Sequence, residues 1–114
     1  MVEWNPITGH ASQVLDDLRK KLSLHQRGKQ VKIGISTDPK ARWRKHSKSK
    51  KHEWEKMIVV YKTSSHKSVS FIETELIAFC ADKYPDKIEN EVLGGGGINN
   101  PENFSNFYVY FLVK

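Results

Sequence analysis

The stretch VKIGISTDPKARWRKH, residues 31–46, has the clearest structural pattern in the sequence. Apolar residues alternate with polar or small ones over 31–36, the period of two expected of a strand with one buried face. Lys32, Gly34 and Ser36 would share the other face. Because Gly34 has no side chain, a ligand could approach the sheet closely there.

The beginning of a helix follows this strand. Asp38 is a typical capping residue and Pro39 suits the first helical position, so we expect a helix over about 39–46. Arg42 and His46 are four residues apart and would share one face of that helix. The junction of strand and helix would then bring together Lys32, Gly34, Arg42 and His46. Such a cluster is suited to binding a phosphate.

These residues resemble the second strand and first helix of the GIY-YIG nuclease domain. In that family a Tyr-Ile-Gly strand is followed, after a short capped turn, by an arginine and often by a histidine four residues later. Lys32-Ile33-Gly34 stands at the Tyr-Ile-Gly position, and Arg42 and His46 stand where the family has its arginine and histidine. The sequence departs from the pattern at Lys32, which replaces a tyrosine, although some family members also have lysine there.

Length and composition indicate one domain, residues 1–114, with an N-terminal helix at about 11–25 and a core over 31–114. A chain of 114 residues can bury a single modest core, and a hydrophobic fraction of 38% argues against disorder. We expect an intracellular protein without membrane contact, because there is neither a secretory signal nor an apolar run of the roughly 20 residues that cross a bilayer. With Cys80 as the single cysteine, an internal disulfide and a cysteine-rich zinc site are excluded.

Positive charge is concentrated in one segment. The formal charge of +6 and the pI near 9.5 favour a polyanionic partner. Besides Arg42, the cations of residues 40–51 are Lys40, Arg44, Lys45, Lys48, Lys50 and Lys51, with no acidic residue among them. Trp43 and Trp54 bracket this patch, and basic residues beside aromatic ones suit nucleic-acid binding. We therefore expect these lysines and arginines, together with Gly34, to contact nucleic acid; the alternative is a solvated helix face followed by a basic loop.

The other elements follow from hydrophobic periodicity. We expect an amphipathic helix over 11–25, a buried strand over 56–63, a helix over 67–83 ended by Pro85, a glycine-containing loop over 90–101 and a strand over 107–114. The glycines Gly94 to Gly97 in the loop are either a connector or a cradle for phosphate.

The helix over 67–83 carries a carboxylate on its apolar face. At about 100° per residue, Glu73 falls inside the apolar arc of this helix, whereas Glu75 lies outside it. A buried carboxylate is costly unless a cation or a metal ion pairs with it. The alternatives are a salt bridge to Arg42 or to a lysine, and a metal ligand. The family resemblance implies the second, a Mg²⁺ or Mn²⁺ ion at Glu73.

Two further site residues are implied by the resemblance. The first strand of the family bears a tyrosine and should precede 31–36, yet we expect only a helix upstream. Residues 107–112 read like that strand, with Tyr110 at the tyrosine position, so we expect a circular permutation that places the C-terminal strand beside the strand over 31–36. Asn90 lies where the family has an asparagine that closes the site, although an ordinary turn asparagine fits equally well.

The sequence thus predicts an α+β fold with a small three-stranded antiparallel sheet flanked by helices. The resemblance implies a metal-dependent endonuclease that hydrolyses DNA phosphodiester bonds, with the catalytic residues Tyr110, Lys32, Arg42, His46, Glu73 and Asn90. We expect duplex DNA in preference to single strands, and a separate protein could supply targeting. The alternatives are an inactive nucleic-acid-binding module, which Lys32 favours, and a basic domain that binds protein or RNA.

Overall fold

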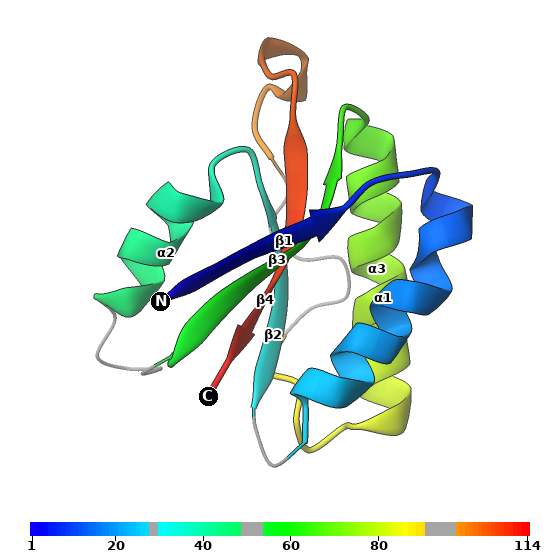
Figure 1. The fold of residues 1–114 in the computed structure, drawn as a ribbon, viewed down its shortest axis with the longest axis vertical. Coiled ribbons are helices and arrows are strands. Elements are labelled where there is room, and N and C mark those ends of the chain that lie inside the picture. The colour runs from blue at the N-terminus through cyan, green and yellow to red at the C-terminus, as the bar shows by residue number, and fades with distance from the viewer. Residues whose placement is uncertain (28–29, 49–53, 91–97) are drawn as a thin grey trace.

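The computed structural model describes residues 1–27, 30–48, 54–90 and 98–114. Its elements are β1 (Val2–Ile7), α1 (Ala11–His25), β2 (Val31–Ser36), α2 (Pro39–Ser47), β3 (Lys56–Thr63), α3 (His66–Lys83), the 3₁₀ helix η1 (Pro101–Asn103) and β4 (Phe107–Val113). The sheet stands between α2 on one side and the pair α1 and α3 on the other (Figure 1). Apart from β1 and η1, the elements agree with those expected from the sequence to within one residue.

The sheet has four strands in the order β1-β3-β4-β2. β1 runs parallel to β3, whereas β4 is antiparallel to both β3 and β2. The prediction of a three-stranded antiparallel sheet is therefore wrong, because β1 extends the sheet and makes it mixed. The sequence of β1, VEWNPI, is hard to predict as a strand because it contains a proline. Pro6 cannot donate a ladder hydrogen bond and is tolerated because β1 lies at the edge of the sheet.

The C-terminal strand β4 lies beside β2, as the sequence predicts. The register pairs Gly34 with Tyr110, Lys32 with Leu112 and Ser36 with Tyr108. Partners in register point to the same face of a sheet. Tyr108 and Tyr110 therefore share the face that carries Lys32 and Gly34.

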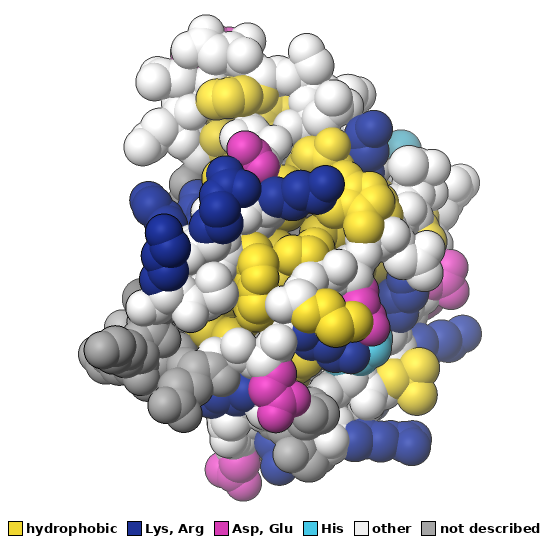
Figure 2. All heavy atoms as spheres, turned by 60° about the vertical axis from the view of Figure 1, so that its left-hand side comes forward, with side chains coloured by type: hydrophobic (Ala, Val, Ile, Leu, Met, Phe, Trp, Pro, Cys, Tyr) yellow, Lys and Arg dark blue, Asp and Glu magenta, His cyan; other side chains and the backbone are white. Residues whose placement is uncertain are grey.

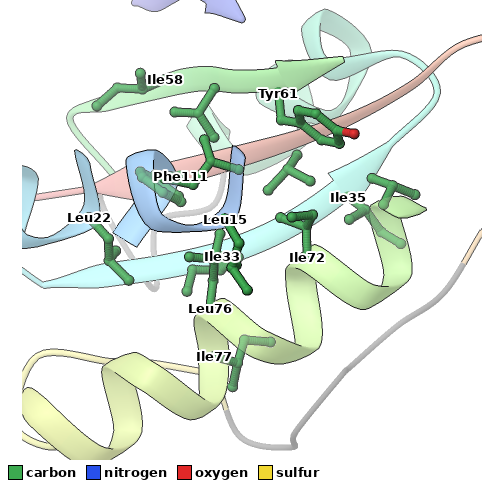
Figure 3. Close-up of a cluster of buried hydrophobic side chains, with 14 of the residues drawn as sticks. Leu15, Leu22, Ile33, Ile35, Ile58, Tyr61, Ile72, Leu76, Ile77 and Phe111 are labelled. Atoms are coloured by element: carbon green, nitrogen blue, oxygen red, sulfur yellow. The ribbon is translucent and has the colours of Figure 1, made fainter. Parts of the chain in front are cut away.

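The larger hydrophobic core lies on the opposite face of the sheet. Figure 3 shows Leu15 and Leu22 of α1 and Leu76 of α3 packed toward Ile33 and Phe111 of the sheet. A smaller cluster on the α2 face contains Trp54, Met57, Val59, Tyr110 and Leu112, with Val2, Trp43 and Tyr108 packed against it. The α2 face is thus only partly filled by apolar side chains, which leaves room for polar groups.

Candidate active site

Tyr110 is the centre of the candidate site, and Gly34 allows it to be there. A Cβ atom added to Gly34 would lie 2.5 Å from Cζ and 2.9 Å from Cε2 of Tyr110, closer than real Cβ contacts. The tyrosine ring therefore fills the space above the glycine and is only 3% exposed. The open approach that we expected at Gly34 is taken by this ring.

Helix α2 brings His46 to the tyrosine hydroxyl. The Asp38 side chain caps the helix by accepting a hydrogen bond from the Ala41 amide at 3.2 Å, and Pro39 follows it at the first helical position. His46 Nε2 lies 3.4 Å from the Tyr110 hydroxyl oxygen. Strand β4 and helix α2, which are far apart in the sequence, thus supply two groups that can exchange a proton.

Two side chains of opposite charge also affect the pKa of the Tyr110 hydroxyl. Burial raises the pKa of Tyr110 to about 12; the positive charge of Arg42 opposes this rise and the negative charge of Glu73 adds to it. Both charged residues therefore lie within electrostatic reach of the hydroxyl. Tyr110 is protonated at neutral pH and can donate a hydrogen bond.

Glu73 is a buried carboxylate on α3. It is 4% exposed, and burial raises its pKa to about 7. Within the described part of the chain Glu73 has no hydrogen-bond or ion-pair partner, so the salt bridge to Arg42 or to a lysine is not formed there. By contrast, Glu75 lies 3.5 Å from Arg19. Without a cation partner, this carboxyl keeps its proton to a higher pH than usual, and it could hold a divalent ion in its ionised form.

Asn90 holds the outer edge of β2. Its Oδ1 accepts a hydrogen bond from the Ile33 amide at 2.9 Å, and its Nδ2 donates one to the Ile33 carbonyl at 2.8 Å. Backbone bonds from Val31 to Lys87 and from Glu89 to Val31 continue this pairing. The segment thereby covers part of an edge strand and positions the backbone beside Gly34.

The predicted basic residues fall on α2 and its surroundings. Lys40, Arg44, Lys45 and Lys48 are exposed, and Lys32 is half-buried on β2. Lys50, Lys51 and the glycines Gly94 to Gly97 lie outside the described residues. Figure 2 shows Lys and Arg side chains gathered beside a hydrophobic area on the side of the molecule where α2 lies. This surface combines positive charge with an apolar area.

The tryptophans have different positions from those expected. Trp54 is 6% exposed and Trp43 packs against the smaller cluster, so neither presents an open ring to a ligand. Trp4 on β1 is 47% exposed, and its ring centroid lies 5.2 Å from that of Tyr108. Sequence reasoning missed Trp4, although the alternation of Val2 and Trp4 with polar residues was a signal for a strand.

The described residues contain no group of three or more His, Cys, Asp or Glu side chains that could hold a metal ion. A divalent ion at Glu73 would therefore have few side-chain ligands from these residues and would take most of its ligands from water, as Mg²⁺ commonly does. In the same part of the chain, no helix has the length and apolarity needed to span a membrane.

Comparisons with known proteins find no matching family model, no matching curated protein and no matching solved structure. The resemblance to GIY-YIG nucleases therefore stays a prediction from the sequence.

Proposed function

We propose that this protein is a metal-dependent endonuclease that hydrolyses phosphodiester bonds of DNA. The observation that carries the proposal is the buried carboxylate of Glu73, which has no cation partner among the described residues. Its charge and that of Arg42 both affect the pKa of Tyr110, whose hydroxyl oxygen lies 3.4 Å from His46 Nε2. A domain that only bound a polyanion would gain nothing from a buried negative charge beside its phosphate site.

The proton chemistry follows from the protonated state of Tyr110. With a pKa of about 12, Tyr110 does not act alone as a base at neutral pH. Its hydroxyl can act as a relay: the oxygen takes a proton from the attacking water while its own proton passes to His46 Nε2. The water oxygen forms the new bond to phosphorus, the bond to the leaving oxygen breaks, and solvent protonates the leaving oxygen.

Arg42 and Lys32 would supply positive charge to the phosphate. The positive charge of Arg42 opposes the rise in the pKa of Tyr110, and Lys32 lies two positions from Gly34 on the same face of β2. Fixed cations that face developing negative charge lower the barrier most when water is excluded. Glu73 would hold the divalent ion, whose chemistry when bound is to neutralise charge on the phosphate and on the leaving oxygen.

The second candidate function is a nucleic-acid-binding module without turnover. Lys32 favours it, because a lysine stands where the similar family has a tyrosine. Such a module would use the exposed cations of α2 for phosphate contacts, with an affinity that falls as salt rises.

Nicking of supercoiled plasmid DNA tests the proposal. Purified protein is incubated at low salt with Mn²⁺ or with a chelator, and Glu73→Gln is compared with Glu75→Gln, a control on the same helix whose carboxylate pairs with Arg19. We expect metal-dependent nicking by the wild type and the control, and about a 100-fold loss or more in Glu73→Gln.

Equal nicking by Glu73→Gln would overturn the role of this carboxylate. An absence of nicking in the wild type, together with salt-sensitive DNA binding that Glu73→Gln leaves unchanged, would establish the binding module instead. Tyr110→Phe adds a second probe, because it removes the relay oxygen but keeps the ring over Gly34.

A further inference from the structure

Trp4, Tyr108 and Lys40 form a cluster on the α2 face, which we call the aromatic platform; Trp4 and Lys40 are exposed and Tyr108 is half-buried. Trp4 comes from β1 and Tyr108 from β4, and their ring planes meet at 53° across the intervening strand β3. The Lys40 Nζ atom lies 5.6 Å from the Trp4 ring centroid. Three elements thus place two rings and an ammonium group together at the surface.

Folding by itself does not explain the exposure of Trp4. The rings of Trp43 and Trp54 on the same face contribute to the smaller cluster, whereas Trp4 belongs to neither hydrophobic cluster. The Trp4 side chain is 47% exposed beside an ammonium group, so it offers a ring face to a base and a cation to the phosphate of that base. Base stacking on such a ring is worth about 1–3 kcal/mol and tolerates any sequence.

The platform lies close to the candidate active site. Tyr108 and Tyr110 are two residues apart on one face of β4, a spacing of about 7 Å from the rise of a strand. Because the Trp4 ring lies against the Tyr108 ring, a nucleotide on Trp4 would be a near neighbour of a phosphate at Tyr110.

We propose that the aromatic platform binds an unpaired nucleotide next to the scissile phosphate. The base stacks on the exposed Trp4 ring, the tilted Tyr108 ring contacts the edge of the base, and Lys40 moves from the Trp4 ring to the phosphate of that nucleotide. Bases inside a duplex are stacked on one another and reach a protein ring only when they are unpaired or flipped out. The inference rests on the proposed function and specifies its substrate, DNA in which a duplex adjoins an unpaired base.

Binding in a chelator tests the platform without cleavage. Fluorescence anisotropy compares a blunt duplex with the same duplex extended by a short single-stranded overhang. We expect the wild type to bind the overhang DNA at least about fivefold more tightly, the lower limit of one stacked base. Trp4→Leu should abolish this preference while affinity for the blunt duplex is kept, and Trp4→Phe should restore part of it.

Phe71→Leu is the matched control, because Phe71 is 44% exposed but lies on α3, on the other side of the sheet. It should retain the wild-type preference. A second measurement does not depend on a variant: photocrosslinking of 5-bromodeoxyuridine in the overhang to wild-type protein should label Trp4 or Tyr108, as mapped by peptide mass spectrometry.

An unchanged preference in Trp4→Leu, no preference in the wild type, or crosslinks confined to other residues would each overturn the platform. The plasmid experiment separates this failure from failure of the proposed function. Nicking without an overhang preference leaves the nuclease and removes the platform, whereas a Trp4-dependent preference without nicking places the platform on a binding module.

Discussion

The two faces of the sheet differ along a single strand, β4. Val109 and Phe111 point into the core formed with α1 and α3 and are fully buried, whereas Tyr108 and Tyr110 point to the α2 side and present hydroxyl groups. Two helices close one face, and one short helix covers part of the other. The comparison teaches that one face stabilises the fold, while the other can hold polar groups because less of its surface is filled by packing.

Alanine substitutions on β4 should show the largest difference between the faces. Phe111→Ala removes a fully buried ring and should lower the free energy of unfolding by about 3–5 kcal/mol. Tyr108→Ala removes a half-buried ring from the other face and should cost about 1 kcal/mol. Urea denaturation followed by circular dichroism measures both. Equal losses would contradict the division of roles.

Glu73 is the exception on the helical side, because it brings a charge into a buried position. Its pKa is raised from 4.5 to about 7, so the folded state holds the proton more tightly than the unfolded state does. Stability should therefore fall as the pH rises from about 4.5 to 7 and level off above that.

The loss amounts to about 3 kcal/mol in metal-free protein. Glu73→Gln should match the wild type near pH 4 and exceed it in stability near pH 8. Thermal unfolding in chelator across this pH range measures the effect, with Glu75→Gln as the control. A difference between Glu73→Gln and wild type that does not change with pH would refute burial of the Glu73 charge as the cause.

Gly34→Ala should disturb the α2 face by forcing Tyr110 out of place. The added methyl group overlaps the ring, and we expect a loss of about 2 kcal/mol. In a Tyr110→Leu background the same change should cost much less, which a double-mutant cycle by denaturant unfolding measures. Additive losses would mean that the ring does not constrain position 34.

Asn90→Ala should have a small effect on stability, about 1 kcal/mol, because it removes two side-chain hydrogen bonds from the backbone of Ile33 at the edge of β2. Amide exchange at Ile33 should accelerate, while Val109 in the middle of the sheet keeps its protection. Asn103→Ala, at an exposed position in η1, serves as the control. Unchanged exchange at Ile33 would show that the Asn90 side chain does not hold the edge.

Local sequence pattern was sufficient to predict most helices and strands and one residue of the candidate site. The helices α1, α2 and α3 and the strands β2, β3 and β4 could be predicted because periodicity and capping residues such as Asp38 act within a few positions. Glu73 was found for the same reason, since its burial follows from its place on the apolar arc of a helix.

Features that depend on contacts between distant segments were decided only by the tertiary structure. β1 carries a proline and little apolar surface, and it becomes a strand because β3 offers it a parallel partner. Gly34 is required by the ring of Tyr110, and Asn90 is held by the edge of β2; neither contact leaves a trace in local periodicity. Trp4 was missed and Trp54 misjudged because the exposure of an aromatic ring depends on which distant segments pack over it.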